Sequence, residues 1–179
     1  MFDTKQYIVE QKLATLRFIL CVKDVNGTLL GYIKHQRKGL AGFNFLFEDT
    51  LGTRLGEVDR KGAFFPSECE VKDRNGQLVA RIRYIKESKW RGWYWMEDAQ
   101  GQRLFTTGKG DYKAHGFQLT APDGSAIAQV HKKWVTARDS YGVEILRQGF
   151  DPFLILSYVV IMHERARAGH RSIFDIGPY

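Results

Sequence analysis

A short pattern of apolar and polar positions recurs six times along this 179-residue chain. Each copy places an apolar residue five positions before a glycine and a second apolar residue three positions after it. Five copies also place aspartate three positions before the glycine, whereas the fifth copy has Ala121 there and Asp123 beside its glycine. The six glycines are Gly27, Gly52, Gly76, Gly101, Gly124 and Gly142.

The sequence Asp-x-x-Gly is typical of a type I turn between two strands. Aspartate at the first position bonds to backbone groups further along the turn, and glycine at the fourth adopts a left-handed conformation at little steric cost. Between two extended segments this sequence makes a hairpin with a bulge. Aromatic and β-branched runs, such as residues 43–47 and 82–85, flank the turns and favour strands. Six hairpins predict about twelve antiparallel strands.

One segment near the C-terminus predicts a helix that is apolar on every face. Asp151 and Pro152 are a typical helix start, and the ten residues 153–162 that follow carry no charge. Basic residues and then Gly169 favour a helix end, so we expect a helix over about 151–168. Ten apolar residues are about half of the roughly 20 needed to cross a bilayer, which favours burial within the protein.

A sheet of about twelve strands has exposed edges unless it closes, and a barrel of that width needs something to fill it. We therefore predict a mainly β fold, a closed antiparallel barrel around the central C-terminal helix. Four copies of the pattern have a small residue four positions after the glycine, which favours close approach of another element. These residues are Gly31, Gly56, Ala80 and Ala128. By length, residues 1–179 form one domain with tails at 1–4 and 170–179.

The composition restricts the classes of partner and the compartment. A formal net charge of +7 and a pI of about 9.4 favour anionic partners without identifying them. Cys21 and Cys69 predict free buried thiols in a reducing cytosol, with a single disulfide as the alternative. The N-terminal sequence resembles neither a signal peptide nor a lipidation signal. We therefore expect a cytoplasmic protein and leave peripheral membrane association open.

No motif in the sequence predicts a catalytic site. The five histidines show no metal-ligand spacing, and a nucleophile elbow, a Walker loop and a dinucleotide-binding fingerprint are all missing. The Gly-Lys-Gly sequence at Gly108–Gly110 is too short for a phosphate-binding loop. We therefore expect a protein that is not an enzyme and that needs no cofactor.

Two basic clusters supply the candidate binding residues. The first lies where we expect a connection between hairpins, and the second interleaves cations with tryptophan and tyrosine up to Trp95. Cations beside amphipathic rings suit an anionic membrane surface, and they also suit single-stranded nucleic acid. A simpler alternative is that Trp93 and Trp95 fill the barrel core. The candidate residues for lipid headgroups are Lys34, Arg37, Lys38, Lys86, Lys89, Trp90 and Arg91.

Two stretches of the sequence resemble a known family. Tyr7–Lys12 followed by Val25–Gly27 resembles the opening of LURP-one-related proteins. Ile127–Trp134, then Asp139–Ile145, then Asp151 and the apolar helix resemble both LURP-one-related proteins and phospholipid scramblases. The likeness spans about residues 5–165. It implies the tubby C-terminal-like fold, a closed twelve-stranded barrel around one hydrophobic helix.

The functional implications of this resemblance are narrower. Scramblases are associated with a calcium-binding segment at the last turn, where this chain keeps Asp139. Ala137 and Gln148 stand where that segment carries acids, so too few oxygen ligands remain and we expect no metal site. Tubby domains bind phosphoinositide headgroups through basic residues of the barrel wall, but those positions have no residue-by-residue match here.

The first hypothesis is a non-enzymatic module that docks on anionic lipid headgroups or membrane surfaces through a basic and aromatic face. The alternative is a soluble scaffold that binds a protein partner. Lipid translocation is disfavoured because the helix would have to leave the barrel, and nucleic acid is disfavoured because no recognition helix is present. The sequence leaves the oligomeric state open.

Overall fold

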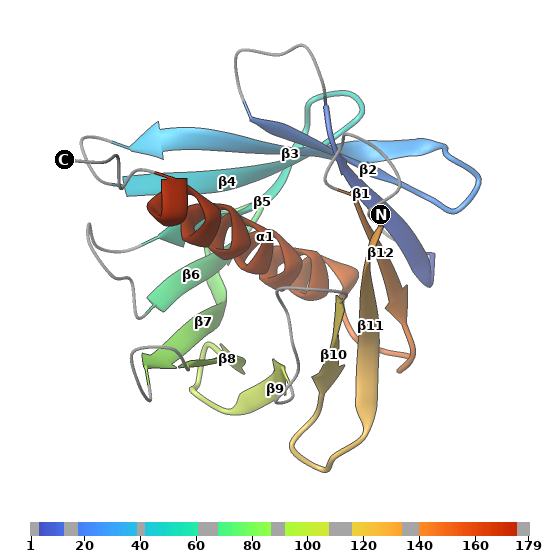
Figure 1. Cartoon of the computed structure of the whole chain (residues 1–179). Helices are drawn as coiled ribbons and strands as arrows, with labels where there is room; N and C mark the ends of the chain where they lie inside the picture. The colour runs from blue at the N-terminus through green and yellow to red at the C-terminus, as the bar shows by residue number, and fades with distance from the viewer. Residues whose placement is uncertain are drawn as a thin grey trace, which may run out of the picture.

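The computed structural model describes residues 4–12, 18–38, 42–60, 68–86, 92–107, 116–133 and 140–174, without the side chains of 37–38, 42, 85–86, 92–93, 132–133 and 165–174. The described residues form twelve strands and one helix (Figure 1). The strands are β1 (Gln6–Gln11), β2 (Ile19–Lys23), β3 (Leu29–Lys38), β4 (Gly42–Asp49), β5 (Arg54–Arg60), β6 (Glu68–Asp73), β7 (Leu78–Lys86), β8 (Gly92–Asp98), β9 (Arg103–Thr107), β10 (Gly116–Thr120), β11 (Ala126–Lys133) and β12 (Ser140–Ile145). The helix, α1, spans Pro152–Phe174.

The twelve strands close into one antiparallel barrel, which confirms the predicted fold class. Each strand pairs with the next along the chain, and β12 pairs with β1 to complete the ring. Figure 1 shows the strands arranged around α1, which runs through the middle of the ring. Closure removes the exposed strand edges that an open sheet of this size would present.

Five of the six predicted turns lie at one end of the barrel, which we call the turn end. Their glycines have φ between 80° and 88°. In the second turn the carboxylate of Asp49 accepts hydrogen bonds from the N–H groups of Leu51 at 2.9 Å and Thr53 at 2.8 Å. The strand pairing shifts register just before each turn, which is the predicted bulge. The confirmed copies are those at Gly27, Gly52, Gly76, Gly101 and Gly124.

The sixth predicted turn is wrong. Gly142 lies within β12, where it pairs with Ile8 of β1 and His131 of β11. The connection between β11 and β12, which includes Asp139, lies outside the described residues. The predicted number of strands is nevertheless right, because the N-terminal strand β1 supplies the partner that a sixth hairpin would have supplied.

The repeated pattern decides which side chains face the interior. The apolar residue five positions before each of the five turn glycines is fully buried. The residue four positions after the glycine is buried as well, including the four small residues that the sequence singled out. At Gly56 a Cβ atom would lie 2.6 Å from the carbonyl oxygen of Lys72 and would also overlap the ring of Phe153 in α1. The small residue therefore makes room for the helix, as predicted.

The helix α1 fills the barrel, which confirms its predicted burial. Its N-terminal turn lies near the turn end, where Phe153 packs edge-on against Phe47 with ring centroids 5.0 Å apart. The first turn is capped by Asp151, whose carboxylate accepts a hydrogen bond from the Phe153 N–H at 2.9 Å. Every residue from 155 to 163 is buried. The helix runs from there toward the opposite end of the barrel, which we call the far end.

The predicted end of the helix is wrong. We expected it to stop near residue 168, with Gly169 as the terminating residue, but α1 continues to Phe174. Glycine favours a helix end but does not force one, because in a helix interior it lowers stability by only about 1 kcal/mol relative to alanine. Residues 170–174 of the predicted C-terminal tail are therefore helical, and residues 175–179 lie outside the described part of the chain.

Replacing Gly56 by alanine is expected to destabilise the protein by about 1–3 kcal/mol, because the added Cβ overlaps the Phe153 ring and the Lys72 carbonyl. Urea unfolding followed by circular dichroism measures the change in free energy. Gly142→Ala is the matched control, since it is also a strand glycine but its nearest atom is the His131 carbonyl oxygen at 4.0 Å. Equal losses in the two variants would contradict this account of the helix contact.

Asp49 predicts a defined response to acid. Hydrogen bonds from the Thr53 backbone, partly opposed by desolvation, lower its pKa below the ordinary value of 3.8. Its carboxylate therefore stabilises the fold above that value, and the contribution is lost as pH falls through the lower folded pKa. Asp49→Asn keeps an oxygen acceptor without the titration. Between pH 5 and pH 2.5 the urea midpoint should fall further in the wild-type protein than in this variant, and parallel losses would contradict the assignment.

Candidate functional site

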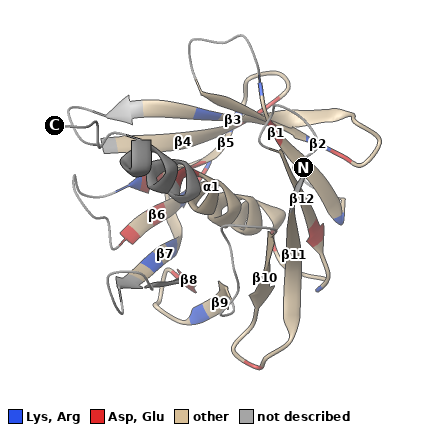
Figure 2. Ribbon diagram, in the orientation of Figure 1, with Lys and Arg blue, Asp and Glu red and all other residues tan. Residues whose placement is uncertain are grey.

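The outer wall of the barrel carries a belt of ion pairs, most of them between neighbouring strands. Figure 2 shows basic and acidic positions interleaved over β6 to β9. Lys72 on β6 lies 3.3 Å from both Asp59 on β5 and Glu70 on its own strand. Burial alone would lower the pKa of Lys72, but the bonds to these two carboxylates raise it overall. The remaining members of this ion-pair belt are Glu10–Lys23, Lys34–Glu48, Arg54–Glu57, Arg81–Glu68, Arg83–Glu68 and Arg83–Glu97.

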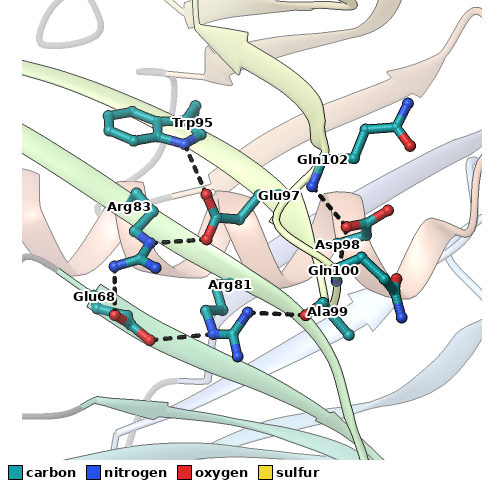
Figure 3. Close-up of polar contacts among 9 residues, drawn as sticks. All are labelled: Glu68, Arg81, Arg83, Trp95, Glu97, Asp98, Ala99, Gln100 and Gln102. Carbon is teal, nitrogen blue, oxygen red and sulfur yellow. Dashed lines mark hydrogen bonds and ion pairs between the residues drawn. The ribbon is translucent and has the colours of Figure 1, made fainter.

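In the middle of the belt, Arg83 of β7 bridges the two strands beside it (Figure 3). Its Nη1 donates to Oε2 of Glu68 on β6 at 2.7 Å, and its Nε donates to Oε1 of Glu97 on β8 at 2.9 Å. The bond to Glu97 raises the pKa of Arg83. Arg81, two residues earlier on the same face, lies 3.4 Å from Glu68 and donates to the Ala99 carbonyl at 3.1 Å. These guanidinium groups are neutralised within the wall.

Trp95 lies on the outer wall next to this network. Its Nε1 donates to Glu97 at 3.4 Å, and the guanidinium of Arg103 lies 5.0 Å from the centroid of its ring (Figure 3 shows the Glu97 contact). The alternative that Trp95 fills the core is therefore wrong. Met96 is the inward apolar residue of the repeated pattern, so strand alternation turns Tyr94 inward and Trp95 outward. The side chain of Trp93 is not among those described.

Lys34 is the one predicted headgroup residue whose side chain the structure describes, and it already forms an ion pair. Lys34 points outward from β3 and forms an ion pair with Glu48 of β4. Its side chain is 38% exposed and that of Glu48 is 12% exposed. A phosphate that replaced Glu48 as the partner of Lys34 would leave a largely buried carboxylate without a cation. This cost disfavours Lys34 as a headgroup ligand.

Of the other six predicted residues, three have a described backbone. Arg37 and Lys38 end β3, and Lys86 ends β7, but their side chains are not described. Lys89, Trp90 and Arg91 lie outside the described residues altogether. The two clusters are separated in sequence. The strands β3 and β7 are nevertheless parallel to each other in the antiparallel ring, so both end at the same end of the barrel.

Charge is distributed unevenly between the wall and the far end. The described side chains include 12 of the 27 basic residues and 15 of the 20 acidic residues, so they carry a net negative charge. The sequence between the strand ends at the far end, together with residues 165–174 of α1, contains the other 15 basic residues but only three acidic ones. The segments counted are 13–17, 37–42, 61–67, 85–93, 108–115, 132–139 and 165–174.

Two polar side chains of α1, Tyr158 and His163, have structural roles inside the barrel. The Tyr158 hydroxyl of α1 donates to the Tyr94 carbonyl at 2.9 Å, and burial raises the pKa of this phenol, which keeps it protonated as a donor. His163 stacks on Phe18 with centroids 5.5 Å apart, and its Nδ1 lies 2.9 Å from the Tyr141 hydroxyl. These contacts fix α1 against β8, β12 and Phe18, the residue just before β2.

Within the described residues, no group of three or more His, Cys, Asp or Glu side chains is placed to hold a metal ion. The weak calcium candidate Asp139 is outside that part of the chain. Among the helical residues described, no stretch has both the length and the apolar character needed to span a bilayer.

Sequence reasoning missed the ion-pair belt, although a signal was present. Glu68 and Glu70, Arg81 and Arg83, and Trp95 and Glu97 each stand two residues apart, and a spacing of two places side chains on one face of a strand. The apolar residues of the repeated pattern point inward, and successive side chains of a strand point to opposite faces. Together these two facts would have placed all six residues on the outer wall. Which carboxylate meets which cation depends on strand register and was not visible in the sequence.

Comparison with known proteins identifies similarity at the level of family and fold. The family model described as LURP-one-related matches residues 5–163. The crystal structure of an Arabidopsis thaliana protein superposes with a TM-score of 0.63 at 19% sequence identity, covering 89% of this chain and 90% of that one. At this identity the likeness shows the fold alone. No curated protein matches the chain.

Removing the charge of Glu97 is expected to destabilise the fold by about 1 kcal/mol, because Arg83 loses one of its two partners in a partly buried pair. Thermal unfolding of Glu97→Gln at low and high salt measures this effect, which should shrink as salt screens the pair. Glu144→Gln is the control, since Glu144 accepts a hydrogen bond from the neutral Gln6 side chain at 3.0 Å. A loss that does not change with salt would contradict the electrostatic origin.

Proposed function

The chain belongs to the LURP-one-related family, and we propose that it is a non-enzymatic binding module that docks on anionic lipid surfaces through the far end of its barrel. The observation that carries this proposal is the separation of charge. Fifteen of the 27 basic residues belong to the far-end segments and the C-terminal part of α1, against three of the 20 acidic residues.

The barrel wall is a poor candidate for the docking surface. Its cations are bonded to carboxylates on neighbouring strands, as Arg83 is to Glu68 and Glu97. Separating such a pair to bind phosphate costs the existing bond and leaves a carboxylate facing an anionic surface. Lys34 is paired with Glu48 in the same way, so we leave Lys34 out of the proposed contacts.

The far end avoids this cost because its sequence contains few acids that compete for its cations. Each Lys or Arg near an anionic leaflet contributes roughly 1 kcal/mol, and the attraction declines over about one Debye length, about 10 Å at 0.1 M salt. Several cations gathered at one end of a rigid barrel therefore give a useful and salt-dependent affinity without a deep pocket. Lys38 and Lys86 end two strands that reach this end.

Lipid translocation is less well supported. It would require α1 to leave the barrel and would break contacts such as the Tyr158 hydrogen bond to the Tyr94 carbonyl. It would also expose the inward faces of the strands, where Phe47 and Phe105 are fully buried. Each large apolar side chain returned to water costs about 1.5–3 kcal/mol, so the barrel strongly favours the enclosed helix.

Co-sedimentation with vesicles tests the proposed docking surface. The wild-type protein should sediment with vesicles that contain phosphatidylserine but not with pure phosphatidylcholine vesicles, and binding should fall as salt rises. The double variant Lys38→Glu/Lys86→Glu should bind more than about tenfold more weakly, because each position reverses a contribution of roughly 1 kcal/mol.

Arg74→Glu is the matched control for that experiment. Arg74 is an exposed cation in the turn between β6 and β7, at the opposite end of the barrel. Its reversal changes the net charge without changing the far end, so vesicle binding should stay nearly as strong as in the wild-type protein. Equal losses in both variants would reduce the effect to net charge, and no preference for phosphatidylserine would remove the proposal.

A further inference from the structure

The turn end of the barrel carries exposed apolar side chains that the fold does not use. Within the described residues, three large apolar side chains are exposed: Val25 at 54%, Leu51 at 90% and Leu146 at 49%. All three lie at the turn end, Val25 and Leu51 at the tips of neighbouring hairpins and Leu146 just after β12. The hairpins β2–β3 and β4–β5 are adjacent, because β3 pairs with β4.

The repeats provide an internal control for Leu51. In the third turn, Asp73 accepts hydrogen bonds from the N–H groups of Asn75 at 2.9 Å and Gln77 at 2.8 Å. Asp49 makes the same two bonds, at the same distances, to Leu51 and Thr53. The equivalent position holds Asn26, Asn75, Gln100 and Asp123 in the other four turns. Leucine therefore contributes nothing that the turn geometry requires, and its side chain lies in water.

The two turns themselves contribute two carboxylates, Asp24 and Asp49, whereas the exposed Lys5 lies just before β1, beside hairpin β2–β3. Asp24 and Asp49 bond to backbone N–H groups of their own turns, which leaves their negative charge in place. The backbone bonds lower the pKa of Asp49, so it is ionised at neutral pH. The cations next to the two turns on these hairpins, Lys23 and Arg54, are bonded to the wall carboxylates Glu10 and Glu57.

We propose that the tips of hairpins β2–β3 and β4–β5, formed by Val25 and Leu51 with Asp24 and Asp49, bind a protein segment that presents an apolar side chain flanked by Lys or Arg. An anionic membrane does not fit this surface, because two carboxylates accompany the apolar tips. A basic and apolar protein segment fits both the exposed leucine and the charge. We call this surface the Leu51 patch.

The position of the Leu51 patch is compatible with simultaneous docking on a membrane. It lies at the opposite end of the barrel from the strand ends Lys38 and Lys86. A barrel held by its far end would direct its turn end away from the lipid. The patch stands on residues 22–30 and 47–56 alone and does not depend on the lipid proposal. The two activities can therefore be removed separately.

A phage-displayed library of random linear peptides is the direct test. Selection on the immobilised wild-type protein, with counter-selection on Leu51→Asn, should enrich peptides in which a large apolar residue lies next to Lys or Arg. A synthetic peptide with the enriched sequence should bind Leu51→Asn at least about tenfold more weakly by calorimetry, as for an apolar anchor residue at an interface. Asp49→Asn, which keeps the turn acceptor but loses the charge, should weaken binding less and reduce its dependence on salt.

Asn75→Leu is the matched control, because it places leucine at the same position of another turn. Asn75→Leu should bind the peptide no more strongly than the wild-type protein does. Leu51→Asn should keep the wild-type circular dichroism and the wild-type binding to phosphatidylserine vesicles. Enrichment of acidic peptides, or equal binding to Leu51→Asn, would overturn the proposal. Dimerisation that Leu51→Asn abolishes would also overturn it, since the patch would then bind a second copy of the chain. A blue shift in the fluorescence of Leu51→Trp on neutral vesicles would do so too, since the patch would then bind lipid.

Discussion

The enclosure of α1 by the barrel is the interaction on which the rest of the structure depends. Residues 155–163 are buried on every side of the helix, so no face of this segment can be exposed to water without loss of apolar contacts. A ring of twelve strands is in turn too wide to be filled by its own side chains. Each part therefore needs the other, and contacts such as Phe153 against Phe47 and Gly56 fix how far the helix enters.

This constraint limits where function can reside. The interior is occupied by packed side chains and by hydrogen bonds such as the one from Tyr158 to the Tyr94 carbonyl. The wall consists of hydrogen-bonded strands whose outward charges are mostly neutralised by their neighbours. The two ends differ: the turn end carries the aspartates of the turns and an exposed leucine, whereas the sequence that joins the strands at the other end, together with residues 165–174, contains 15 of the 27 basic residues. Our two proposals together describe an adaptor that joins an anionic surface to a protein partner.

The family assignment and the structural similarity fit the same physical reasoning. The fold is shared with an Arabidopsis protein at 19% identity, because a bulged turn needs one acceptor and one glycine, and an inward position needs only an apolar side chain of suitable size. Many sequences satisfy those conditions. The residues at the two ends are not restricted in this way, so a shared barrel transfers the architecture and leaves the ligand to be determined for each protein.

The features that depend on local geometry were predictable from the amino-acid sequence: the five bulged turns, the strands beside them, the start of the helix at Asp151 and the need to enclose it. The remaining features depend on contacts between distant segments. Gly142 has turn-like neighbours but lies in a strand, because β1 is available to pair with it. The helix passes Gly169, since local preferences for a helix end are weak. Arg83 meets Glu68 and Glu97 because the register of β7 with β6 and with β8 brings residues 15 and 14 positions apart onto one face.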